Sequence, residues 1–205
     1  MLFPPVNFGM VEEDLYRSAL PTEINFPFLE TLQLKKIIFL YPDKDDLLDV
    51  QFRTFLEDQG IELECLGDDN NKRVKSYSPI EEETVIEALR IVVDSSNYPL
   101  LVTCATGKHR TGAVIACLRK IQKWNLTAIF EEYRRFTGKK IRVQNEHFIE
   151  LFDTELVEVD RKVIAECPPF LHYLIKNDQQ QAREEAMVNN LQYESNHNNS
   201  SFLLR

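Results

Sequence analysis

The sequence predicts an α/β fold in which a central, mostly parallel sheet is flanked by helices. Three short apolar segments, bounded by turn residues, have the length and composition of buried strands, and they span residues 35–41, 61–66 and 99–104. The segments between them repeat apolar residues with helical spacing. Strands that alternate with helices are typical of parallel sheets, because each connection has to return along the sheet through a helix.

The elements before the second apolar segment each have a local signal. A first strand that ends in a turn is expected within residues 14–23, and a short helix within residues 25–34. The next helix follows the 35–41 strand and ends at Gly60, a residue type favoured just after a helix. Its predicted apolar face consists of Leu48, Phe52, Phe55 and Leu56.

The later elements are all predicted to be helices, apart from the strand at 99–104. The helix that precedes this strand has Ser78 as a candidate N-cap, Pro79 in the first helical position and Glu81 three residues after the cap, which together form a capping box. Further helices are expected at 111–123, 127–136 and 144–154, with Gly138 as a break between the last two.

Composition limits the organisation of the chain and its partners. With 205 residues, of which 43% are hydrophobic, the chain is long enough for one well-packed domain, expected at residues 1–176. Residues 177–205 are rich in Asn, Gln, Ser and Glu, which predicts a disordered tail. No apolar run is long enough to span a membrane, and the first residues do not resemble a signal peptide, so a cytoplasmic protein is expected.

The charged residues and cysteines exclude several classes of function. A net charge of −9 argues against nucleic-acid binding. Residues 104–142 are nevertheless basic, with ten Lys or Arg and only two Glu. The four cysteines are scattered, without the spacing of a disulfide framework or a metal site, so no metal and no cofactor are expected.

The turn "CATGKHRTG" carries the strongest functional signal. Cys104 ends an apolar strand, five residues separate it from Arg110, and a helix follows. A loop at a helix start presents backbone N–H groups and the positive end of the helix dipole to one point, which favours a tetrahedral anion and the thiolate form of the cysteine. Gly107 is expected to let the backbone bend closely around the anion, Arg110 to hold two of its oxygens, and Thr111 to donate a hydrogen bond to the sulfur.

This Cys-x5-Arg-Thr pattern resembles that of the cysteine-dependent tyrosine phosphatases. Together with "PPVNFG", "LYRSALPTE" and "FIELFD", it is similar to the plant and fungal atypical dual-specificity phosphatases, and most to the fungal branch named for oxidant-induced cell-cycle arrest. The resemblance implies a dual-specificity phosphatase fold without a metal requirement. The phosphate would be bound by the loop residues Ala105, Thr106, Gly107, Lys108, His109 and Arg110.

The resemblance also implies a substrate range and a cellular context. Relatives act on phosphotyrosine or other aryl phosphates, and some prefer inositol pyrophosphates. Lys108 and His109 would add cationic donors to the loop. Oxidative-stress or cell-cycle signalling and a complex with related phosphatase-like chains are further expectations, and an easily oxidised Cys104 suits a redox-responsive protein.

The chain departs from its relatives at three places. Thr103 stands where a His is common before the cysteine, which predicts a weaker enzyme. Ala19 follows Arg17 and Ser18 of the first strand where relatives have glycine; this change has no assigned role, and a surface turn is its simplest explanation. Arg73 replaces an acidic residue in the loop that precedes the capped helix.

The general acid and the substrate rim are predicted from spacing and charge. Asp68 or Asp69 lies at a suitable distance before Cys104 to protonate the leaving group, although a solvated acidic turn explains them equally well. A phosphate leaving group, with a second pKa of about 6, needs this proton far less than a phenol with a pKa of about 10. The expected rim adds Lys72, Arg73 and Lys75, which favours inositol pyrophosphates over phosphotyrosyl peptides.

Alternative interpretations remain for the loop and for the other cysteines. A phosphate-binding adaptor that turns over slowly or not at all would need the same cradle, whereas a sulfur-transfer enzyme often has a loop one residue shorter. Cys65 and Cys117 are expected to be buried core residues, and Cys167 has no assigned role.

Overall fold

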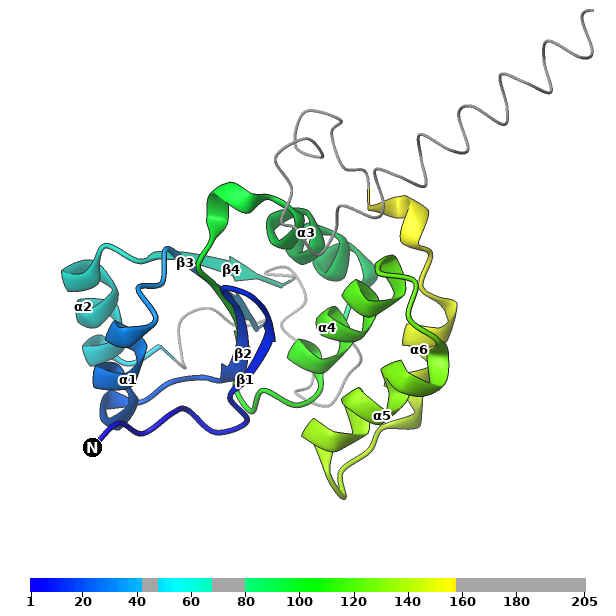
Figure 1. The fold of residues 1–205 in the computed structure, drawn as a ribbon, viewed down its shortest axis with the longest axis horizontal. Helices are drawn as coiled ribbons and strands as arrows, with labels where there is room; N and C mark the ends of the chain where they lie inside the picture. Colours follow the sequence, from blue (N-terminus) through cyan, green and yellow to red (C-terminus); the bar gives the residue numbers. More distant parts are fainter. Residues whose placement is uncertain (42–47, 68–79, 158–205) are drawn as a thin grey trace, which may run out of the picture.

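The fold is a five-stranded sheet with helices on both faces, seen in a computed structural model that describes residues 1–41, 48–67 and 80–157 (Figure 1). The strands are β1 (Gly9–Glu12), β2 (Leu15–Ala19), β3 (Lys36–Leu40), β4 (Glu62–Leu66) and β5 (Leu100–Cys104). Their order across the sheet is β1-β2-β5-β3-β4, and every neighbouring pair is parallel except β1 and β2. The predicted α/β class is confirmed.

Helices α1 (Phe26–Thr31) and α2 (Val50–Gln59) cover one face of the sheet, and α3 (Glu82–Val93) and α4 (Arg110–Ile121) cover the other (Figure 1). Helices α5 (Leu126–Thr137) and α6 (Val143–Leu151) pack against α4. Three short 3-10 turns complete the described elements: η1 (Glu23–Asn25), η2 (Ser95–Asn97) and η3 (Thr154–Leu156). None of the helices within the described ranges is long and apolar enough to span a bilayer.

Strand β5 lies at the centre of the sheet, and all five of its residues are buried. Its side chains alternate between the two cores, because successive residues of a strand point to opposite faces. Leu100, Val102 and Cys104 join the core beneath α3 and α4, whereas Leu101 joins the core beneath α1 and α2. Burial on both faces explains why this strand is a continuous apolar run.

Two features differ from the sequence-based expectations. The antiparallel hairpin of β1 and β2 was not predicted, because β1 has only four residues and exposes most of Met10. The expected capping box is wrong for the described helix, since α3 begins at Glu82 and extended Glu81 is its N-cap. Ser78 and Pro79 lie outside the described residues, as do the predicted domain end at 176 and the tail at 177–205.

Candidate active site

The turn that contains Cys104 lies at the carboxyl end of the central strand, between β5 and α4. In open α/β sheets, ligands bind at this edge, where loops connect the carboxyl ends of the strands to the helices that follow. Neighbouring β2 and β3 run parallel to β5, so their carboxyl ends reach the same edge. Cys104 itself is 4% exposed, and its side chain belongs to the core shared with α4. We call residues 104–110 the phosphate loop.

The phosphate loop passes so close to the end of β2 that one position must be glycine. Gly107 has a φ of +65°, and a Cβ there would lie 2.4 Å from Ala19 N and 2.5 Å from Ser18 C. Both contacts are with backbone, which cannot move aside like a flexible side chain. The sequence predicts that this glycine lets the backbone approach an anion, but in the structure it is the close approach of β2 that requires glycine here.

The carbonyl oxygens of the phosphate loop are almost all used within the protein. Side chains donate to two of these oxygens, and backbone N–H groups donate to three more. Thr106 O accepts from Asn7 Nδ2 (2.8 Å), Gly107 O from Arg17 Nη2 (3.0 Å), Cys104 O from Leu20 N (2.9 Å) and Gly107 N (3.3 Å), Lys108 O from Gly112 N (3.1 Å), and His109 O from Ala113 N (2.8 Å).

Most backbone N–H groups of the same loop, unlike that of Gly107, have no partner among the described residues. Among the described residues, the backbone N–H groups of Ala105, Thr106, Lys108 and His109 donate to no other group. Free amides at the start of a helix, with the neighbouring carbonyls turned to other partners, form a nest that favours an anion. The geometry therefore supports the predicted phosphate cradle beside Cys104.

Arg110, the first residue of α4, is half-buried next to the cysteine. Its guanidinium lies 5.6 Å from the ring centroid of Tyr41. Burial lowers the pKa of Arg110, and the charges of Cys104 and Tyr41 partly offset this. A cation that is incompletely solvated beside the sulfur is well placed to gain a phosphoryl group as its counter-charge.

Thr111, the residue after Arg110, is fully buried. Its Oγ1 has no partner among the described residues, so the predicted hydrogen bond to the Cys104 sulfur is absent from this structure. Thr103, on the other side of the cysteine, is also fully buried, and its Oγ1 donates to Ser18 O at 3.0 Å. Its hydroxyl ties β5 to β2 directly before the phosphate loop.

The charges of four cations act on the ring of His109, which is itself neutral near pH 7. Burial lowers the pKa of His109 to about 4, with further contributions from Arg142, Lys108, Lys140 and Arg110. The expectation that His109 adds a positive charge is therefore wrong, because desolvation and four nearby charges oppose its protonation. We call Lys108, Arg110, Lys140 and Arg142 the basic cluster; the last two come from the connection between α5 and α6.

A hydrogen-bonded chain that the sequence did not reveal orients His109. Asn145 Nδ2 donates to the Tyr133 hydroxyl at 2.9 Å, and that hydroxyl lies 3.2 Å from His109 Nδ1. The Tyr133 hydroxyl thus accepts from Asn145 and shares a second hydrogen bond with His109 Nδ1, which fixes the orientation of the ring. The only sequence signal was the basic connection between α5 and α6, which brings Asn145 to this end of the molecule.

The remaining predicted residues divide into two groups. The prediction that Cys117 is a core residue is confirmed, since it is fully buried and burial raises the pKa of its thiol. Cys65 is only partly buried. The candidate acids and rim residues Asp68, Asp69, Lys72, Arg73 and Lys75 lie outside the described residues, as does Cys167. Within the described ranges, no group of three or more His, Cys, Asp or Glu could hold a metal ion.

Residues 17–19, for which a surface turn was one expectation, are buried. Arg17 and Ser18 are 1% and 0% exposed, and Ala19 is 6% exposed. They are buried because β2 pairs with the central strand β5 along its whole length.

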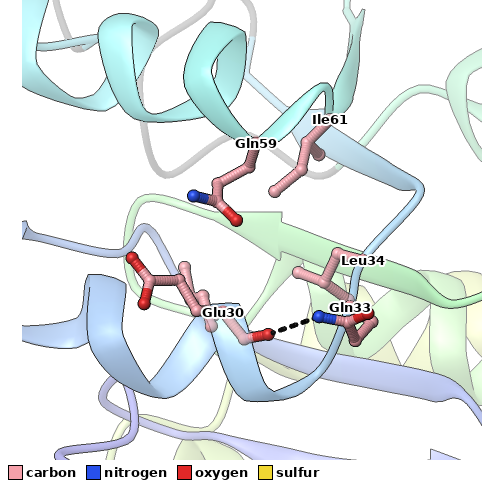
Figure 2. A pocket seen from close by; sticks show the side chains of 6 residues that line it. Glu30, Gln33, Leu34, Gln59 and Ile61 are labelled. Atoms are coloured by element: carbon pink, nitrogen blue, oxygen red, sulfur yellow. Dashed lines mark hydrogen bonds between the residues drawn. The ribbon is translucent and has the colours of Figure 1, made fainter.

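A cavity of about 130 Å³ lies elsewhere, between α1 and α2 (Figure 2). Leu34 and Ile61 in its wall precede β3 and β4, so it opens at the amino ends of these strands, whereas the phosphate loop lies at the carboxyl end of β5. Its other lining residues are Leu29, Glu30, Gln33 and Gln59. This cavity is not part of the candidate site.

Comparisons with known proteins agree with this geometry. The sequence pattern of the tyrosine phosphatase family matches residues 2–168. The "Probable tyrosine-protein phosphatase DG1060" of Dictyostelium discoideum is 60% identical over 154 residues, covering 75% of this chain and 90% of the relative. "Inositol diphosphatase DSP1" of Oryza sativa is 44% identical over 153 residues, covering 75% of this chain and 67% of the relative.

A solved structure shares the fold. The catalytic core of the PP-IP phosphatase SIW14 of S. cerevisiae, in complex with citrate, is 40% identical and superposes with a TM-score of 0.69 over 77% of this chain and 91% of that one. These similarities favour a catalytic phosphatase over an inactive adaptor. The chain therefore belongs to the tyrosine phosphatase family and has the fold of a cysteine-dependent phosphatase.

Proposed function

We propose that the chain hydrolyses phosphate esters or anhydrides, with Cys104 as the nucleophile, Arg110 as a phosphate ligand and a phosphocysteine intermediate. The observation that carries the proposal is the division of hydrogen bonds in the phosphate loop. Its carbonyl groups are used inside the protein, while four amide N–H groups beside Cys104 have no partner among the described residues. Such a loop stabilises the charge of a transferring phosphoryl group.

The reaction then takes two balanced steps. The Cys104 thiolate attacks phosphorus, and the bond to the leaving oxygen breaks with its electron pair remaining on that oxygen. Water next attacks the phosphocysteine, and the sulfur leaves as a thiolate while inorganic phosphate is released. Thr111, whose buried hydroxyl has no partner among the described residues, is our candidate donor to the departing sulfur.

We further propose that the preferred substrates are inositol pyrophosphates. The basic cluster places four cations from two parts of the chain around one end of the phosphate loop, more charge than a peptide with a single phosphate requires. A phosphate leaving group, with a second pKa of about 6, departs with little help from a general acid. The names of the rice relative and of the yeast structure support this substrate class.

Residues outside the described ranges complete the proposal. Asp68 or Asp69 is the candidate general acid, and Lys72, Arg73 and Lys75 are candidate substrate ligands. A cytoplasmic location, a role in oxidative-stress or cell-cycle signalling and a complex with related phosphatase-like chains stay predictions.

A substrate panel with purified protein tests the proposal. We expect kcat/KM to be about tenfold higher or more for an inositol pyrophosphate than for a phosphotyrosyl peptide, because the basic cluster attracts the more highly charged molecule. In the Cys104→Ser variant, turnover of both should vanish while binding of the inositol pyrophosphate persists. A preference for the peptide would contradict the substrate class. Equal hydrolysis by the parent protein and the Cys104→Ser variant would contradict the cysteine mechanism.

A further inference from the structure

Arg17, on the strand next to the phosphate loop, is among the largest fully buried side chains of the molecule. It is 1% exposed and lies opposite Val102 in the pairing of β2 with β5. Its Nη2 donates to Gly107 O at 3.0 Å, and its Cζ lies 3.6 Å from the centroid of the Phe136 ring. The guanidinium thus sits directly beneath the loop that surrounds Cys104.

The charge of Arg17 has no carboxylate partner among the residues that the structure describes. Within the described ranges, no ion pair joins it to Asp or Glu, and its buried Nε has no hydrogen-bond partner at all. Burial lowers the pKa of Arg17 to about 10, and the charges of Glu132 and Cys104 partly offset this, so the group remains a cation at neutral pH. A buried cation without an anionic partner is costly, and the cost falls when an anion binds nearby.

Arg119 is a second buried arginine in the same fold, and carboxylates balance its charge. It is also buried, at 4% exposure, but it forms ion pairs with Glu12 and Glu132. Its Nη2 additionally donates to Val11 O at 3.0 Å. The charge of Arg119 is thus balanced by two carboxylates, whereas the described partners of Arg17 are a loop carbonyl and an aromatic ring.

We propose that Arg17 is a positioning residue of the phosphatase site, which holds the Gly107 carbonyl behind the phosphate loop and supplies buried positive charge to the anion in front of it. This inference rests on the proposed function. In a planar trans peptide, the C=O and the N–H point in opposite directions. Fixing the Gly107 carbonyl therefore fixes the Lys108 N–H on the other side, where it has no protein partner within the described ranges.

The test measures oxyanion binding without turnover. Tungstate is titrated by calorimetry into the Cys104→Ser protein, alone and combined with Arg17→Gln, Arg17→Lys or the control Arg119→Gln. Arg17→Gln should weaken tungstate binding about 10- to 100-fold, the range expected for one charge-assisted hydrogen bond. Arg17→Lys keeps the charge but not the planar fork, so a loss of about three- to tenfold is expected.

The control separates a role in the site from a role in folding. Arg119→Gln should lower the thermal midpoint but change tungstate affinity less than about threefold, because it touches no part of the phosphate loop. Unchanged affinity in both Arg17 variants, or in Arg17→Lys alone if Arg17→Gln does not fold, overturns the inference. Turnover by the parent enzyme is assayed separately: an inactive parent whose tungstate binding depends on Arg17 contradicts only the proposed function.

Discussion

At the scale of single residues, His109 shows how neighbours change the chemistry of a side chain. From the sequence, a histidine between Lys108 and Arg110 is expected to be an additional cation. Burial and four nearby charges instead lower the pKa of its ring, which stays neutral. The hydrogen bond between Nδ1 and the Tyr133 hydroxyl, at 3.2 Å, orients this ring. The phosphate loop therefore combines full positive charges with an imidazole ring that stays neutral near physiological pH.

Titration of His109 followed by NMR tests this directly. We expect its pKa near 4, and Arg142→Gln should raise it toward the ordinary value of about 6.5 by removing the nearby charge with the largest effect. Because the folded-state pKa lies below the unfolded value, protonation opposes folding, so this group lowers stability as pH falls from about 6.5 to 4. A titration midpoint above 6 in the parent protein would contradict the neutral assignment.

Gly107 offers a second test at this scale, with Gly60 as a matched control. Both have a φ of +65°, but a Cβ at Gly60 would meet nothing within 4 Å, whereas at Gly107 it would meet the backbone of β2 at 2.4 Å. Gly60→Ala should cost about 1 kcal/mol of unfolding free energy. Gly107→Ala should cost about 3 kcal/mol or more and abolish activity. Urea unfolding and turnover measure both, and equal costs would argue against the β2 contact.

At the scale of elements, helices α5 and α6 brace the phosphate loop from outside the sheet. Tyr133 on α5 joins Asn145 on α6 to His109 in the loop. Removing this hydroxyl leaves the buried amide of Asn145 without its acceptor, which is more costly than losing an exposed hydrogen bond. The helices that follow the catalytic signature thus take part in shaping it.

The change Tyr133→Phe, measured by urea unfolding, tests the brace. The expected loss is about 1–2 kcal/mol, because a buried donor loses its partner. Tyr16→Phe is the matched control: its hydroxyl bonds to Asp14 at 3.4 Å in an exposed position, so a change within about 0.5 kcal/mol is expected. Similar losses in the two variants would show that the α5–α6 chain adds no special stability.

At the scale of the whole molecule, an acidic chain concentrates positive charge at one end of its sheet. The chain carries a net charge of −9, yet Lys140 and Arg142 are brought to the phosphate loop by the packing of α5 and α6 against α4. Such a local field attracts anions in proportion to their charge, and salt screens it over a Debye length of about 8 Å at physiological ionic strength.

Salt dependence of kcat/KM tests this field. Raising ionic strength from about 0.05 to 0.3 M should lower kcat/KM severalfold more for an inositol pyrophosphate than for p-nitrophenyl phosphate, because the first substrate reaches the whole basic cluster and the second mainly the phosphate loop. Lys140→Gln combined with Arg142→Gln should bring the two salt dependences together. Equal dependence in the parent protein would place the substrate away from the cluster.

The sequence alone determined the α/β class, the central strands and the placement of Cys104 and Arg110 around a helix start, because strand burial, helix periodicity and the Cys-x5-Arg spacing are local patterns. It did not reveal the β1–β2 hairpin, the burial of Arg17 or the neutrality of His109. These depend on contacts between segments distant in the chain: Arg17 meets Gly107, and His109 meets Tyr133. Burial and the electric field at a side chain are set by such neighbours, so only the tertiary structure decided how the phosphate loop is held and charged.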